Sequence, residues 1–112
     1  MTILEIAKAA PQPYRGELLL RIASGVGPLR LANGEDWYDL AGGLLIVKGK
    51  DIDIAFETER FRAYTFRTGG QHWEGEVYVY GTGGFFAGRG ESAALALWEA
   101  VAWAKERFSR PC

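Results

Sequence analysis

The sequence has little cysteine and little histidine, and this scarcity excludes several kinds of site. Cys112 and His72 are each the single residue of their type in the 112-residue chain. One cysteine cannot form an intramolecular disulfide, so we expect a fold that does not need an oxidising compartment. One histidine and one cysteine at the last position cannot supply the nitrogen and sulfur ligands of a zinc-type site. We therefore expect no metal centre and no cofactor.

Long apolar runs are also missing. No run approaches the ~20 residues that a membrane-spanning helix needs. The first eight residues include Glu5 and lack the long apolar core of a signal peptide. We therefore expect a cytoplasmic protein with no membrane association.

The chain has no excess of charge of one sign. Its 13 basic and 14 acidic residues give a net charge of −1, which disfavours a strongly basic nucleic-acid binder because binding of that kind depends on counterion release. Hydrophobic residues make up 48% of the chain and charged residues 24%, the composition of a folded globular protein. The length fits a single domain, residues 1–112, with a core of its own.

Helices are predicted at both ends of the chain. Pro11 and Pro13 end a first helix at residues 2–10, and a second helix is predicted at residues 14–24. A strand is the competing interpretation of residues 17–22, because their leucine run has no clear period. A long helix begins after Ser92, a good N-cap residue, and continues to Phe108.

Between the helices, the apolar run at residues 44–47 predicts a short buried strand. Alternating residues predict strands at 51–56, 60–67 and 73–80, and a glycine hairpin leads into a short strand at 85–87. Residues 28–43 show only two turn signals, at 33–34 and 42–43. The prediction is one α+β domain. Its mainly antiparallel sheet of about four strands is flanked by N-terminal helices and a long C-terminal helix.

One face of the predicted sheet is aromatic and polar. Alternation places Tyr64, Phe66, Tyr78 and Tyr80 together on it, and this much aromatic area needs a cover or a partner. Either the N-terminal helices cover this face, giving three layers, or the face docks a partner. We favour three layers, because residues 1–27 need an apolar surface to pack against.

The search for catalytic residues is negative. A Ser–His–acid arrangement would have to use His72, which lies in a turn, and no G-x-S-x-G motif exists. Residues 88–93 read G-x-G-x-x-A, but the second parallel strand and the acidic residue of a dinucleotide site are missing. An all-carboxylate site that could bind a hard cation is conceivable at Asp51, Asp53, Glu57 and Glu59. Asp51 and Asp53 would lie side by side on one strand face, although a solvated strand face explains these residues as well. We predict no enzymatic activity.

Acidic residues provide the candidate binding site. They alternate along two predicted strands and could meet a basic surface, gaining encounter rate and specificity. An ordinary solvated strand edge is the alternative interpretation of each residue. The set consists of Asp51, Asp53, Glu57, Glu59, Glu74 and Glu76.

Residues 70–101 resemble the C-terminal part of a double-stranded RNA-binding domain. The resemblance rests on His72 before the strand at 73–80, on Gly88-x-Gly90-x-Ser92, and on an alanine-rich final helix. Two lysines follow the serine in that family and grip phosphates, whereas this chain has alanines at both positions, 93 and 94. The resemblance implies duplex RNA binding as the alternative function. The basic residues available for it are Arg60, Arg62, Arg67 and Arg89.

A second, diffuse resemblance covers most of the chain. Residues 13–18 (PYRGEL), 21–23 (RIA) and 88–102 are similar to the small phage and prophage proteins with an α-β-α sandwich domain. This resemblance implies a three-layer fold, and no catalytic residue is carried over from it. We therefore expect a non-enzymatic phage or prophage protein that binds a macromolecule. The expected partner is a protein, for example a host defence complex, as for anti-CRISPR proteins. The oligomeric state stays open.

Overall fold

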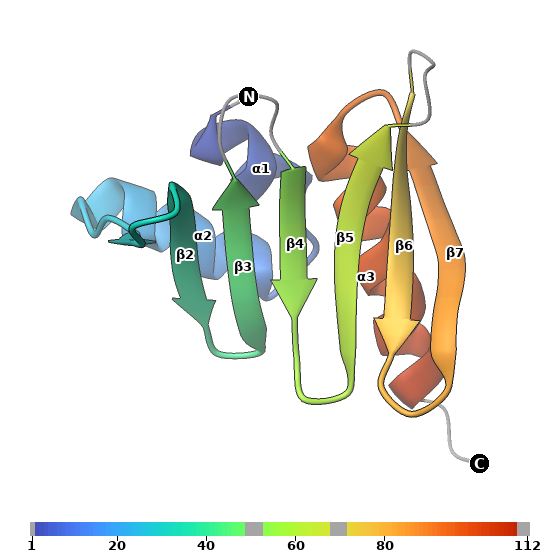
Figure 1. Ribbon diagram of the computed structural model, residues 1–112. Coiled ribbons are helices and arrows are strands. Elements are labelled where there is room, and N and C mark those ends of the chain that lie inside the picture. The colour runs from blue at the N-terminus through green and yellow to red at the C-terminus, as the bar shows by residue number, and fades with distance from the viewer. Residues whose placement is uncertain (1, 49–52, 68–71, 110–112) are drawn as a thin grey trace.

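The computed structural model describes residues 2–48, 53–67 and 72–109, which form three helices and a single antiparallel sheet (Figure 1). The helices are α1 (Ile3–Ala9), α2 (Tyr14–Ser24) and α3 (Ala93–Ser109). The strands are β1 (Leu29–Arg30), β2 (Glu35–Leu40), β3 (Gly43–Lys48), β4 (Asp53–Glu57), β5 (Phe61–Arg67), β6 (Trp73–Val79) and β7 (Gly83–Gly90).

Each strand of the sheet pairs with its neighbours in sequence. The order is β1-β2-β3-β4-β5-β6-β7, and all pairs are antiparallel, so the sheet is a simple meander. The α+β class of the prediction is confirmed. The predicted number of about four strands is too low, because β1 and β2 lie in residues 28–43, where no strand was predicted. The strand β7 is also longer than the predicted 85–87.

The helix boundaries follow from their capping residues. The Thr2 hydroxyl accepts a hydrogen bond from the Glu5 N–H at 3.3 Å, and the Ser92 hydroxyl accepts one from the Leu95 N–H at 3.2 Å. Gly25 ends α2 in the left-handed conformation, with φ 71°. Residues 17–22 are therefore helical, and the competing strand interpretation is wrong.

All three helices lie on the same face of the sheet (Figure 1). The indole N–H of Trp98 in α3 donates to the Ile6 carbonyl oxygen of α1 at 2.9 Å. The Tyr14 ring of α2 stacks on Trp98 with 5.9 Å between centroids and contacts Phe56 of β4 at 4.9 Å. These contacts fix α1 and α2 beside α3, so the expected three-layer arrangement is wrong.

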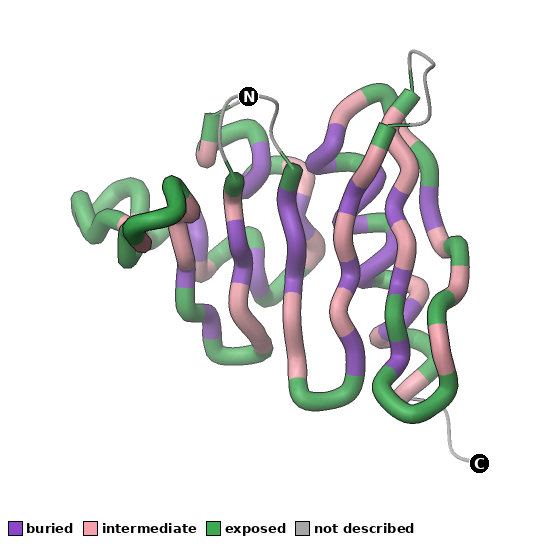
Figure 2. Tube along the Cα trace, viewed as in Figure 1, coloured by how far each residue is buried: buried purple, intermediate pink, exposed green. Residues whose placement is uncertain are grey.

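The core lies between the helices and this covered face (Figure 2). Phe56, Leu45 and Val77 point into it from the sheet, and Leu18 and Leu97 point into it from α2 and α3. Burying each of these side chains contributes about 1.5–3 kcal/mol.

Two glycines bring α3 unusually close to the sheet. A Cβ added at Gly75 in β6 would collide with the carbonyl oxygen of Ala96, and one added at Gly88 in β7 would lie 3.0 Å from the same oxygen. The helix backbone therefore rests directly on these strands. This close approach explains why β6 and β7 contain glycine where strands ordinarily contain larger residues. Within the described residues, no helix is long and apolar enough to cross a membrane.

Candidate functional site

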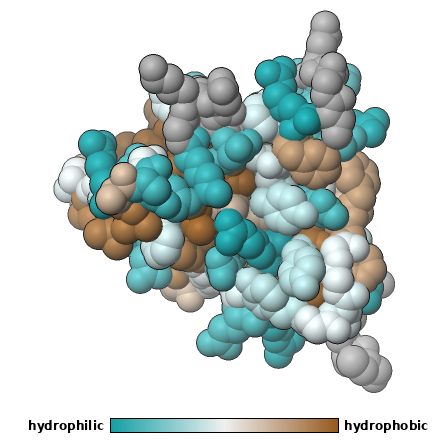
Figure 3. All heavy atoms as spheres, in the orientation of Figure 1, coloured by the Kyte–Doolittle hydropathy of each residue, from teal (hydrophilic) through white to brown (hydrophobic). Residues whose placement is uncertain are grey.

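The face of the sheet opposite the helices, called the open face below, is covered by none of α1, α2 and α3. Strand register places its side chains in rows. The central row is Trp37, Ile46, Ala55, Tyr64, Glu76 and Phe86, and the next row is Asp39, Leu44, Glu57, Arg62 and Tyr78. Figure 3 shows this face, with hydrophilic residues across its middle.

The structure brings four of the six predicted site residues to the open face. Asp53 and Glu57 come from β4, and Glu74 and Glu76 come from β6. Glu59 is exposed in the turn between β4 and β5 and lies outside these rows. Asp51 lies outside the described residues.

Three of these carboxylates are bonded within the protein. Glu57 pairs with Arg62 at 3.4 Å, and Glu74 pairs with Arg89 at 2.9 Å. Glu76 accepts a hydrogen bond from the Tyr64 hydroxyl at 2.7 Å. The carboxylate of Asp53 makes no hydrogen bond or ion pair with any described residue. The acidic residues are therefore mostly fixed in place, not free charges along a strand.

Two tyrosine hydroxyls on this face, those of Tyr64 and Tyr80, are held as hydrogen-bond donors. Burial, and then the hydrogen bond to Glu76, raise the pKa of Tyr64 to about 12. The Tyr80 hydroxyl donates to Glu57 at 3.1 Å. Burial and the Glu57 carboxylate raise the pKa of Tyr80. Glu76 therefore orients the ring of Tyr64. Glu57, which also pairs with Arg62, orients the ring of Tyr80.

Acidic residues outnumber basic ones on the open face. The basic side chains are Lys48, Arg62 and Arg89, and Lys48 contacts Glu35 at 3.8 Å. The acidic side chains are Glu35, Asp39, Asp53, Glu57, Glu74 and Glu76. The described part of this face therefore has a net negative charge, although the whole chain is nearly neutral.

Exposed aromatic rings gather at the β6–β7 side of the open face. Phe86 is 57% exposed, Tyr78 46% and Tyr80 43%. The rings of Tyr78 and Tyr80 meet edge to face with 5.9 Å between centroids. Aromatic residues are enriched at protein-binding surfaces.

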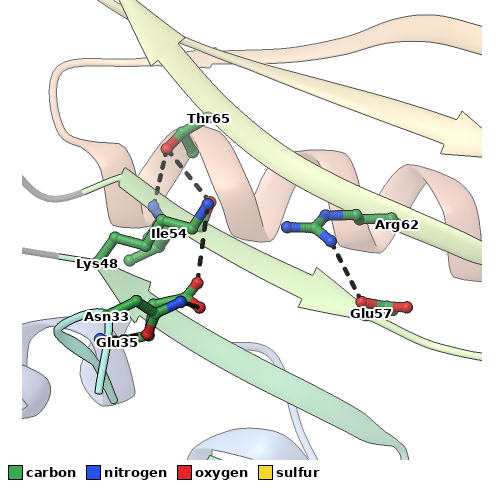
Figure 4. A network of polar contacts seen from close by, with 7 residues as sticks. All are labelled: Asn33, Glu35, Lys48, Ile54, Glu57, Arg62 and Thr65. Carbon is green, nitrogen blue, oxygen red and sulfur yellow. Dashed lines mark hydrogen bonds and ion pairs between the residues drawn. The ribbon is translucent and has the colours of Figure 1, made fainter. Parts of the chain in front are cut away.

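A pocket of about 370 Å³ opens on this face where β4 and β5 separate. The two strands pair only from residues 55–57 to 62–64. Beyond these pairs, the Thr65 hydroxyl accepts from the Ile54 N–H at 3.2 Å and donates to the Ile54 carbonyl oxygen at 3.3 Å (Figure 4). The lining residues are Lys48, Asp53, Ile54, Ala55, Arg62, Tyr64, Thr65 and Tyr78.

The sequence analysis missed this pocket. The available signal was Ala55, a small side chain between Asp53 and Glu57 on a strand face that is otherwise large and polar. The pocket depends on strand separation, which alternation along one strand does not indicate.

The arginines named for RNA binding do not form one surface. Arg62 and Arg89 are held in ion pairs on the open face. Arg67 lies over the Trp73 ring at 5.2 Å. Arg60 lies over the ring of Phe108 in α3 at 5.6 Å, on the covered side.

No group of three or more His, Cys, Asp and Glu residues in the described part of the chain is arranged to hold a metal ion. Comparison with protein-family models, with curated proteins and with solved structures found no match to this chain. The geometry of the open face therefore provides the basis for inferring function.

Proposed function

We propose that this protein is a non-enzymatic binding protein whose open face docks on a basic surface of another protein. One observation carries the proposal: all three helices lie on one face of the sheet, and they leave an acid-rich, aromatic face uncovered (Figure 1).

The composition of the open face supports a protein partner over a nucleic acid. Its acidic residues would repel phosphates, and its arginines already have carboxylate partners. Exposed Tyr78, Tyr80 and Phe86 offer rigid rings for apolar contact with a protein.

The internal bonds of this face also support docking. Tyr64, Tyr80, Arg62 and Arg89 are each held by a hydrogen bond or an ion pair to a glutamate. Side chains that are already ordered lose less conformational entropy when a partner binds. The face is therefore prepared for a fixed arrangement of contacts.

We extend the proposal to the class of partner. A host complex that binds nucleic acid has a basic surface, and an acidic face could occupy that surface in place of the nucleic acid. The sequence resemblance to small phage proteins makes a role against host defence part of the proposal, although the fold lacks the third layer that this resemblance implies.

Charge reversal tests the docking face directly. The variant Asp39→Lys with Asp53→Lys reverses two exposed carboxylates that have no bonded partner among the described residues. Glu99→Lys, on the exposed side of α3, is the matched control. Nuclease-treated host extract supplies candidate partners, and each candidate is purified and titrated against the three proteins.

The proposal expects one purified partner to bind the wild type and the Glu99→Lys control equally and to bind the double variant at least tenfold more weakly. Equal binding of all three proteins would refute docking through this face. Filter binding with duplex RNA at two salt concentrations tests the alternative function. Tight, salt-sensitive binding of RNA would overturn the proposal.

A further inference from the structure

The pocket between β4 and β5 is a hollow in the open face. Its volume of about 370 Å³ lies within the range of sites that hold a small group, about 300–1,000 Å³. It is large enough for one side chain of a partner.

The charges around this pocket leave one carboxylate without a partner. Lys48 and Arg62 line it, but Lys48 contacts Glu35 at 3.8 Å and Arg62 pairs with Glu57 at 3.4 Å (Figure 4). Asp53 also lines the pocket, and its carboxylate has no ion pair or hydrogen bond among residues 2–48, 53–67 and 72–109. When Glu35 and Glu57, which lie outside the lining, are counted with their basic partners, the net charge around the pocket is negative.

The aromatic side chains of the pocket are fixed by hydrogen bonds and ring contacts. The Tyr64 hydroxyl is bonded to Glu76 at 2.7 Å. The ring of Tyr78 meets that of Tyr80, whose hydroxyl is bonded to Glu57. The Tyr78 hydroxyl itself has no bonded partner in the described part of the chain. The rings of Tyr64 and Tyr78 thus line the same pocket as the Asp53 carboxylate.

From this geometry we propose that the pocket receives an arginine side chain of the partner protein. A guanidinium is planar, stacks on aromatic rings and donates several hydrogen bonds in a fixed fork. Asp53 would accept an ion pair from it, and Tyr64 and Tyr78 would contact its faces. A lysine ammonium lacks the planar group that stacks, and a carboxylate would be repelled by Asp53. This assignment rests on the proposed function and names the anchor residue of its partner.

Short peptides test the pocket without the partner. The probes are the blocked tripeptides acetyl-Gly-Arg-Gly-amide, its citrulline analogue, which is neutral and nearly the same shape, and the corresponding lysine and glutamate peptides. Each is titrated into the ¹⁵N-labelled full chain while backbone amide shifts are followed. The matched variants are Asp53→Asn in the pocket and Asp39→Asn on the same face outside it.

We expect the arginine peptide alone to give saturable shifts at Ala55, Tyr64 and Tyr78. Asp53→Asn should weaken its binding roughly fivefold, the effect of losing one solvent-exposed ion pair, whereas Asp39→Asn should leave it unchanged. Equal binding of the citrulline, lysine or glutamate peptide would overturn the assignment, and so would the absence of saturable shifts. None of these failures affects the charge-reversal experiment with a purified partner, so the two proposals can fail separately.

Discussion

The substitution Gly75→Ala tests the contact on which the one-sided arrangement of helices depends. The new methyl group would collide with the Ala96 carbonyl oxygen and lie 3.1 Å from the Ala100 Cβ. A backbone carbonyl inside a helix cannot rotate away, so α3 must move off β6. Overpacking of this kind costs about 1–3 kcal/mol, and we expect about 3 kcal/mol because the obstacle is backbone.

For a chain of this length, a loss of about 3 kcal/mol lowers the melting temperature by roughly 12 °C. Urea unfolding followed by circular dichroism measures the free energy, and a thermal scan measures the melting temperature. The control is Gly27→Ala, where an added Cβ meets no atom within 4 Å and the change should stay within about 0.5 kcal/mol. If Gly75→Ala is as stable as this control, α3 does not rest on β6 and the reasoning is refuted.

Three further substitutions test other parts of the structure. Thr65→Val should lower the free energy of unfolding by about 1–3 kcal/mol, because it leaves the buried N–H and carbonyl oxygen of Ile54 unsatisfied. Urea unfolding compares it with Thr65→Ser, which keeps the hydroxyl. Equal losses in the two variants would contradict a stabilising role for the hydroxyl. Trp98→Phe removes the bond to the Ile6 carbonyl and should cost about 1–3 kcal/mol, with faster amide exchange in α1; unchanged exchange would contradict this docking contact. The pKa of Tyr64 is raised from 10.0 to about 12 in the folded state. Its contribution to folding stability is therefore complete below pH 10 and is lost as the pH rises to 12. In urea titrations from pH 9 to 12, the free energy of unfolding should decline less steeply for Tyr64→Phe than for the wild type, and parallel declines would contradict this expectation.

The sequence predicted the elements better than their arrangement. Regular alternation or helical periodicity identified β4, β5, β6 and α3, because each buries one side against the core. The strand β2 was not predicted, because it has apolar residues on both sides: Trp37 on the open side, and Tyr38 and Leu40 on the covered side. This hides the two-residue alternation of a strand. In β7 the glycines that admit α3 read as turns.

The error in layering has a physical cause. The prediction placed the N-terminal helices on the aromatic face of a sheet of about four strands, because residues 1–27 need an apolar surface to pack against. A sheet of seven strands is wider: α3 covers β4 to β7, and α1 and α2 fit beside it on the same side. The seven-stranded sheet carries all three helices on one face, and the other face stays open.

The candidate site was predictable within single strands but not across neighbouring strands. Alternation along β4 and β6 placed Asp53, Glu57, Glu74 and Glu76 on one face. Their partners lie on neighbouring strands, where Arg62 stands opposite Glu57 and Arg89 opposite Glu74. Strand register determines these pairs, and register depends on the turn and on the pattern of both paired strands, so one strand alone does not fix it.

Nitration of tyrosine by tetranitromethane, read by peptide mass spectrometry, tests the central claim that the open face is exposed and binds the partner. Tyr78 is 46% exposed on this face, and Tyr38 is 7% exposed on the covered face. We expect nitration of Tyr78 and not of Tyr38 in the free protein, and protection of Tyr78 once the purified partner is added. A Tyr78 that is protected in the free protein, or that reacts equally fast in the complex, would contradict the account.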